Sequence, residues 1–154
     1  MNAGIDLLVI YHSQSGNTER LAQAIADGAR TVHGVVVRLA RAADVGANDL
    51  RLARSLVVCS PEYFGYMAGA VKDLFDRTYE QVEQEMVGKS YAVVISAGND
   101  GTGALTSVER IVAGYKLRKV QEPIIFSGAV SAEDLARCRE LGCTLAAGLE
   151  LGIY

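Results

Sequence analysis

Six polar or small residues follow one another between a predicted strand and a predicted helix: Ser13, Gln14, Ser15, Gly16, Asn17 and Thr18. At a helix N-terminus, unpaired N–H groups and the helix dipole attract an anion, and nearby hydroxyls add further donors. One polar side chain, such as Asn17 or Thr18, would be enough to cap the helix, so six in succession favour a phosphate site. The segment contains no Lys or Arg, so hydroxyls and backbone amides would bind the phosphate.

A second segment combines aromatic rings with a flexible glycine. It follows a predicted strand at 56–59 and contains Pro61, Glu62, Tyr63, Phe64 and Gly65 in a chain that is only 6% aromatic. Flat rings in a loop can stack on a planar ligand while backbone N–H groups reach its polar edge. At least one ring of this segment is expected to pack inward as part of the core instead.

A third segment is rich in small residues and follows the predicted strand at 91–95. Its members are Ser96, Ala97, Gly98, Asn99, Asp100 and Gly101. Small residues let the backbone approach a ligand closely. Taken alone, this segment is equally compatible with a plain turn.

The elements that position these segments are predicted from hydrophobic patterns. β-Branched runs lie at 5–11, 35–39, 56–59, 91–95 and 124–126. Most of these runs are continuously apolar, which indicates strands buried on both faces. The segments between them show helical spacing, and Ser131 with Asp134 forms the capping box of a last helix. The stretch 41–54 predicts a short helix and little more.

Strands alternating with helices predict an α/β fold, with one open parallel sheet covered by helices on both faces. We expect a single domain over residues 1–154. Right-handed crossovers place all strand-to-helix loops at one edge of the sheet. Ligands bind outside the carboxyl ends of such strands, where the strand order reverses. The three segments described above are therefore expected to meet there.

Composition excludes several partner classes. Fifteen Lys and Arg against eighteen Asp and Glu give a net charge of −3, without the basic stripe that nucleic-acid binding needs. No apolar stretch approaches the roughly 20 residues that span a bilayer, and the N-terminus lacks signal-peptide features. Cys59, Cys138 and Cys143 match no zinc or redox spacing. We expect a cytoplasmic protein without nucleic-acid, membrane or metal partners.

Three further features do not indicate a site. Gly88-Lys89-Ser90 is similar to the end of a P-loop, but a strand rather than a helix follows it. Cys59 ends a strand without the following arginine that a cysteine phosphatase would need. His12 stands beside the phosphate segment, but for a lone histidine a structural or solvent-facing role is favoured over a catalytic one.

The segment 13–18 resembles the FMN-phosphate loop of the flavodoxin-like superfamily, a hydroxyl-x-hydroxyl-Gly-x-Thr pattern after the first strand. The segment 60–69 is similar to the Ser-Pro-x-x-Phe-Gly-x-Met segment of the FMN-dependent NAD(P)H:quinone oxidoreductases of the tryptophan-repressor-binding-protein type. It is also similar to the related NADPH-dependent FMN reductases. The resemblance covers nearly the whole chain, and its match in the third segment is looser.

This resemblance implies a flavodoxin-like three-layer sandwich with a five-stranded parallel sheet of order 2-1-3-4-5. FMN would lie at the switch between the first and third strands. Residues 13–18 would bind its phosphate, residues 61–65 would border the isoalloxazine, and residues 96–101 would line the other rim. The resemblance assigns no catalytic acid or base to the protein.

Two features bear on which flavin chemistry is expected. An electron-carrying flavodoxin clamps the flavin between aromatic rings from two loops and is strongly acidic, whereas here the segment 96–104 has no aromatic residue. An open flavin face and a weakly charged surface favour an NAD(P)H-dependent oxidoreductase that passes electrons through FMN to a small acceptor such as a quinone. The alternatives are a short-chain flavodoxin serving a protein partner and a flavodoxin-like interaction module without flavin. The chain lacks the longer loops and the histidine that quinone reductases carry after the third loop. This departure bears on quinone reduction and on the tetramer associated with it. The sequence leaves open the acceptor, the choice of NADH or NADPH, and a homo-oligomeric state.

Overall fold

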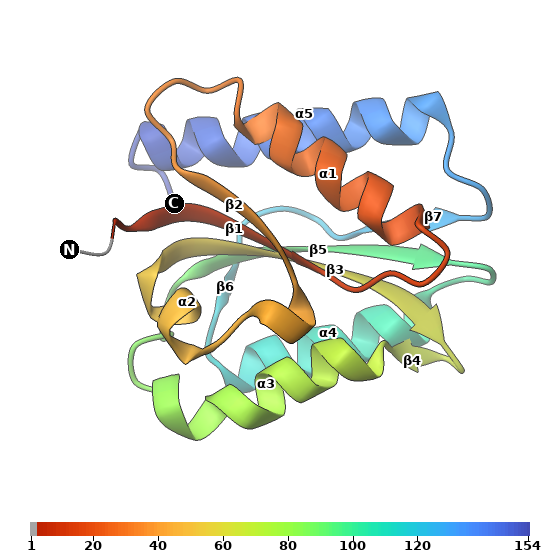
Figure 1. Cartoon of the computed structure of the whole chain (residues 1–154), viewed down its shortest axis with the longest axis horizontal. Helices are drawn as coiled ribbons and strands as arrows, with labels where there is room; N and C mark the ends of the chain where they lie inside the picture. Colours follow the sequence, from red (N-terminus) through yellow and green to blue (C-terminus); the bar gives the residue numbers. More distant parts are fainter. Residues whose placement is uncertain (1–2) are drawn as a thin grey trace.

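The computed structural model describes residues 3–154, which form a twisted sheet between two layers of helices (Figure 1). The central strands are β1 (Ile5–Tyr11), β2 (Val37–Arg41), β3 (Ala53–Tyr63) and β5 (Ser90–Ala97). The short strands β6 (Arg118–Lys119) and β7 (Ile124–Ser127) both pair with β5 in parallel. The order β2-β1-β3-β5-β6, with β7 also beside β5, confirms the predicted order 2-1-3-4-5.

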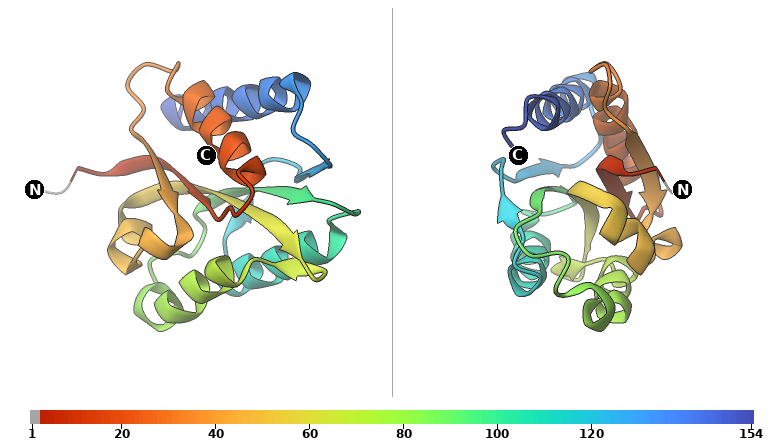
Figure 2. Two further views of the ribbon diagram at one scale, coloured as in Figure 1. Left: turned by 45° about the vertical axis from the view of Figure 1, so that its right-hand side comes forward. Right: turned by 90° about the vertical axis from the view of Figure 1, so that its left-hand side faces the viewer.

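The helices divide between the two faces of the sheet. Helices α1 (Asn17–Ala29) and α5 (Ala132–Glu150) cover one face, and α3 (Gly69–Val82) and α4 (Thr102–Gly114) cover the other. The view along the sheet in Figure 2 separates these layers clearly. Helix α2 (Ala47–Leu52) lies beside α3, after the 3-10 turn η1 (Ala42–Asp44).

Two buried clusters, one on each face of the sheet, explain the continuous apolar runs. Leu8 and Val58 belong to the cluster under α3 and α4, whereas Val9 and Val57 belong to the cluster under α1 and α5. Since successive side chains of a strand point to opposite faces, a strand covered on both sides needs apolar residues at consecutive positions. The sequence pattern therefore predicts the layering directly.

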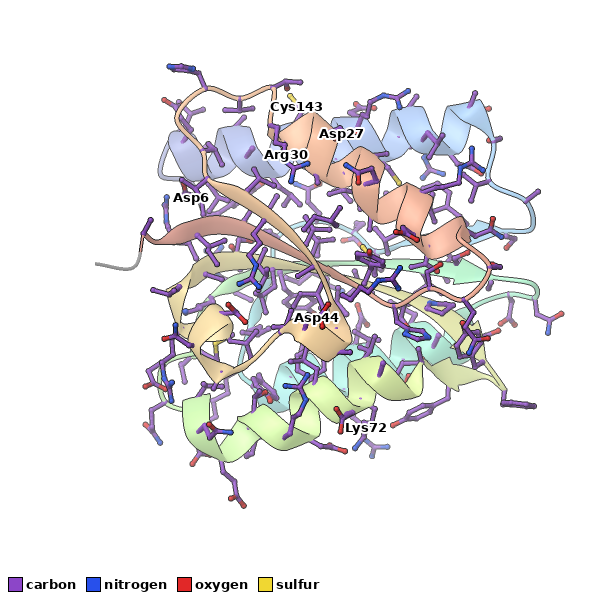
Figure 3. The ribbon with its side chains drawn as sticks, in the orientation of Figure 1. Asp6, Asp27, Arg30, Asp44, Lys72 and Cys143 are labelled. Atoms are coloured by element: carbon purple, nitrogen blue, oxygen red, sulfur yellow. The ribbon has the colours of Figure 1, made fainter. Side chains whose placement is uncertain are left out.

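Charged side chains lie mainly on the solvent side of the helices. Figure 3 shows Asp27 and Arg30 on the outer surface of α1, where they form an ion pair of 3.6 Å. Lys72 projects from α3 on the opposite layer and donates hydrogen bonds to Asp76 one turn later. Exposed pairs of this kind contribute little to stability.

The predicted boundaries differ from the structure in several places. The third strand extends to Ala53–Tyr63, beyond the predicted 56–59, and the second begins at Val37 rather than at 35. The short strand β4 (Tyr66–Met67) pairs antiparallel with β3 and was not predicted. The capping box of α5 is confirmed: the Ser131 hydroxyl accepts from the Asp134 amide at 3.1 Å, and the Asp134 carboxylate accepts from the Ser131 amide at 3.0 Å.

Lys89 has a structural role at the end of α2. Its Nζ donates to the carbonyl oxygens of Leu50 and Arg51 at 2.9 Å and to that of Ala53 at 2.6 Å. Burial lowers the pKa of this ammonium group below its ordinary value. A cation at the C-terminus of a helix satisfies carbonyl groups that have no partner within the helix.

Between residues 3 and 154, no helix combines the length and the apolar character needed to cross a membrane. The same range contains no cluster of three or more His, Cys, Asp or Glu side chains that could ligate a metal ion. Cys59 and Cys138 are buried free thiols, and Cys143 is an exposed one on α5.

Candidate functional site

The loops after β1, β3 and β5 meet at one edge of the sheet, on the right-hand side of Figure 1, as predicted. They surround a cavity of about 250 Å³ at the carboxyl ends of the strands. Its lining residues come from all three predicted segments and from one further position: Gln14, Ser15, Asn17, Thr18, Pro61, Glu62, Tyr63, Ser96, Ala97, Gly98 and Gly128.

The first loop presents the N-terminus of α1 to this cavity. Helix α1 begins at Asn17, and its N-cap is Gly16, whose φ of 97° lies in the left-handed region. Glycine adopts this conformation without steric cost and has no side chain to occupy the first N–H groups of the helix. The alternative that Asn17 or Thr18 caps the helix is therefore wrong, because both residues lie inside it.

The other residues of this loop differ in their contacts and in their exposure. The Ser13 hydroxyl accepts a hydrogen bond from the Gly16 amide at 3.0 Å and does not line the cavity. Gln14 and Ser15 are exposed, whereas Thr18, in the first turn of α1, is only 2% exposed. The loop therefore offers neutral donors around the start of a helix, the arrangement that binds phosphate groups.

The second predicted segment forms a hairpin between β3 and β4. Tyr63 pairs with Tyr66, and the two residues between them, Phe64 and Gly65, have φ of 53° and 71°. Two positive φ values are characteristic of a type I′ two-residue turn. Phe64 is fully exposed at the tip and does not line the cavity, so the expectation that it borders a ligand stays a prediction.

Contacts with α4 hold the backbone of this hairpin. The Glu62 carboxylate accepts from the Ala104 amide at 3.3 Å, and the Ser107 hydroxyl accepts from the Met67 amide at 3.0 Å. A Cβ at Gly103 would lie 2.0 Å from the Gly65 carbonyl oxygen, so only glycine allows this close approach. These contacts hold the backbone of the hairpin, which forms one side of the cavity.

Tyr63 is the aromatic residue that lines the cavity. Burial raises the pKa of its hydroxyl, and the nearby backbone amide of Gln14 opposes that rise. The ring of His12 meets the Tyr63 ring edge-on, with centroids 6.0 Å apart and an angle of 86° between the planes. The first loop therefore contacts the aromatic wall directly.

The third predicted segment contributes only part of its residues. Ser96, Ala97 and Gly98 line the cavity. Asp100 does not line the cavity, and its carboxylate contacts the first residue of α4. It accepts from the Thr102 amide at 3.0 Å and from the Thr102 hydroxyl at 2.9 Å, and these bonds lower the pKa of Asp100.

Two more residues of this segment have structural contacts away from the cavity. The Asn99 carbonyl accepts from the Ser127 hydroxyl at 3.1 Å. Gly101 has a φ of 72°, and a Cβ there would lie 2.6 Å from a methyl group of Ile125. Gly128, after β7, lines the cavity but was not singled out in the sequence, because one glycine after a strand is indistinguishable from an ordinary turn residue.

The lining of the cavity combines donors that suit a phosphate with a surface that suits a planar ring. The donors belong to the N-terminus of α1 and the hydroxyls near it, and the surface consists of Tyr63 and the backbone of 96–98. No Lys or Arg is among its lining residues, so recognition of the phosphate would rely on dipoles and hydrogen bonds.

Comparison with known proteins identifies the family to which this chain belongs. The flavodoxin family model matches residues 9–121. A flavodoxin from Aquifex aeolicus (strain VF5) is 30% identical, over 91% of this chain and 84% of that protein. An NAD(P)H dehydrogenase (quinone) from Acidithiobacillus ferrooxidans (strain ATCC 53993 / BNL-5-31) is 28% identical, over 66% of this chain and 62% of that protein. The solved structure of a flavodoxin from the domain Archaea has the same fold, with a TM-score of 0.85, 24% identity, and coverage of 95% of this chain and 99% of that one. The chain therefore belongs to the flavodoxin family, whose cofactor is FMN.

Proposed function

We propose that the cavity at the carboxyl edge of the sheet binds FMN and that the protein is an electron carrier of the flavodoxin type. The observation that carries this proposal is the meeting of an uncapped helix N-terminus and one aromatic wall in a single cavity. The Aquifex aeolicus flavodoxin supports the carrier function, because its similarity extends over 91% of this chain.

The lining residues have distinct roles in this proposal. Gln14, Ser15, Asn17 and Thr18 bind the phosphate through hydroxyls and backbone amides at the start of α1. Tyr63 stacks on one side of the isoalloxazine, and the backbone of 96–98 borders the other rim. Bound FMN supplies the redox chemistry, and the protein supplies its position and electrostatic environment.

A second candidate function is an NAD(P)H-dependent oxidoreductase that uses a small acceptor such as a quinone. The observation that favours it is the rim opposite Tyr63, where Ser96, Ala97, Gly98 and Gly128 provide no aromatic ring. A flavin face without a covering ring leaves room for a nicotinamide to stack. The sequence alone favoured this function. The similarity to the quinone dehydrogenase spans 66% of this chain at 28% identity, whereas the similarity to the Aquifex aeolicus flavodoxin spans 91% of this chain. We therefore prefer the carrier function.

One anaerobic experiment separates the two functions. The purified protein is loaded with one equivalent of FMN, freed of excess flavin, and mixed with excess NADPH or NADH while the visible flavin band is followed. A carrier keeps its band until a separate reductase or dithionite is added. Bleaching of the flavin band within seconds by either nucleotide would contradict the carrier function and favour the oxidoreductase. Failure to retain FMN would contradict the assignment of the cavity and favour an interaction module without flavin.

A further inference from the structure

His12 lies next to the proposed phosphate loop but does not line the cavity. Its backbone amide donates to the Cys59 carbonyl at 3.3 Å, which continues the pairing of β1 with β3 beyond the end of β1. The side chain is half-buried. This pairing fixes the backbone of His12 beside β3, and the His12 ring contacts the ring of Tyr63 at the end of that strand.

His12 contacts the Tyr63 ring directly. The edge-to-face contact between the two rings, at 6.0 Å and 86°, has the geometry that aromatic pairs prefer. This contact restrains the plane of the Tyr63 ring.

The hairpin by itself fixes only the backbone of Tyr63. The contacts of the hairpin with α4 involve Glu62 and Met67, on either side of the turn. Tyr63 is the last residue of β3, and the tip that follows it is exposed. A half-buried tyrosine at the end of a strand has several accessible rotamers, so side-chain contacts must select one of them.

We propose that His12 is a positioning residue for the flavin, which holds the Tyr63 ring in the orientation that forms one wall of the isoalloxazine slot. This inference rests on the proposed FMN site but not on the choice between carrier and oxidoreductase. His12 directly precedes the loop that is proposed to bind the phosphate, yet it acts on the ring end of the ligand. The segment 12–18 therefore serves both ends of FMN.

Riboflavin provides the test, because it has the isoalloxazine ring of FMN but no phosphate. Dissociation constants for FMN and riboflavin are measured by flavin fluorescence quenching for wild type, His12→Ala, His12→Phe and His33→Ala. His33 is exposed in the loop after α1, at the opposite edge of the sheet, and serves as the matched control.

We expect His12→Ala to weaken both ligands by the same factor, about two- to tenfold, which is the usual range for the loss of one aromatic pair. His12→Phe keeps an aromatic edge and restores binding, and His33→Ala changes neither constant. In a Tyr63→Ala background, His12→Ala has no further effect, because the ring that it positions is absent. If His12→Ala fails to fold by circular dichroism, His12→Gln replaces it with the same expectations.

The outcomes are distinct. Weaker FMN binding with unchanged riboflavin binding would place the action of His12 at the phosphate end and overturn the proposal. Unchanged binding of both ligands, or an equal effect of His12→Ala with and without Tyr63, would also overturn it. A wild-type protein that binds neither flavin would contradict the FMN site itself, whereas wild-type binding that His12→Ala leaves intact contradicts only the role of His12.

Discussion

At the scale of single residues, the proposed site depends on neutral donors in front of a helix N-terminus. Gln14 and Ser15 are exposed, and no Lys or Arg lines the cavity to balance a phosphate charge. An added negative charge at this position would act on the phosphate without a counter-charge to offset it. Gly16 is a poor position for this test, because its φ of 97° would strain any substituted side chain.

Ser15→Asp and Ser15→Asn form a pair of variants that differ in charge and little in size. We expect Ser15→Asp to weaken FMN binding by at least about tenfold, because two negative charges a few ångströms apart repel strongly near a protein surface. Ser15→Asn should change the affinity for FMN little, and neither variant should change the affinity for riboflavin. Titration by fluorescence quenching gives all the constants. Equal losses in the two variants would mean that charge is not the cause.

The strained residue of the hairpin allows a second prediction at this scale. Phe64 is fully exposed and has a φ of 53°, which costs a residue with a Cβ roughly 1 kcal/mol. Asparagine tolerates this conformation and is preferred in type I′ turns.

We therefore expect Phe64→Asn to raise the free energy of unfolding by about 0.5–1 kcal/mol in urea denaturation. Phe64→Ala keeps the strained φ and should show no comparable gain. A destabilising effect of Phe64→Asn would show that the Phe64 ring makes a stabilising contact.

At the scale of elements, helices α1 and α5 pack closely against each other and lie side by side in Figures 1 and 2. A Cβ on Gly28 would lie 1.9 Å from the Arg139 carbonyl oxygen, and a Cβ on Gly142 would lie 1.9 Å from the Ile25 carbonyl oxygen. The two helices therefore touch backbone to backbone, with a glycine on each side of the contact.

Gly28→Ala should force these helices apart and lower the free energy of unfolding by about 2 kcal/mol or more. Gly114→Ala is the matched control, because Gly114 ends α4 and has open space around its added Cβ. That substitution should be neutral or stabilising by up to about 1 kcal/mol. Thermal or urea unfolding measures both variants, and equal effects would contradict the close contact of α1 and α5.

The sequence predicts elements well where local pattern determines them. The apolar runs predict β1 and β5, and the capping box predicts the start of α5 at Ala132, after Ser131. The strand β4 was missed because its turn uses Phe64 and Gly65, whereas the usual sequence signal for a type I′ turn is Asn-Gly or Asp-Gly.

Contacts between distant segments could not be predicted in the same way. In a single sequence, Gly28 is only a weak helix former, and nothing in the pattern indicates that Gly142 lies opposite it. The candidate functional site also depends on contacts that a single sequence does not indicate. The three loops were predicted from their unusual composition, but the contacts of Asp100 with Thr102 depend on a hydrogen-bond geometry that composition does not specify.

At the scale of the whole molecule, buried titratable groups set an alkaline limit to stability. Burial raises the pKa of Cys138 from 9.0 to about 12, and burial also raises the pKa values of Cys59 and Tyr115. A group with a raised pKa stays protonated in the folded state where the unfolded chain has already lost its proton. Its contribution to stability is complete below the unfolded pKa and is lost as the pH rises through the folded pKa.

We therefore expect the free energy of unfolding to fall between pH 9 and about pH 12, the range set by Cys138. Lys89 opposes this trend, because its pKa is lowered by burial and not raised. Cys138→Ala should make the decline less steep than in wild type, as measured by urea denaturation at several alkaline pH values. Identical slopes in the two proteins would contradict the assignment to this thiol.

The central claim is that FMN binds at the carboxyl edge of the sheet, and it is tested most directly by mapping backbone amide shifts in NMR spectra during addition of FMN. The account predicts large shifts confined to 13–18, to Glu62 and Tyr63, and to 96–98, with little change in the groove between α3 and α4. Shifts centred on that groove, on Lys72 and Arg110, would place the flavin at a different site and contradict the account.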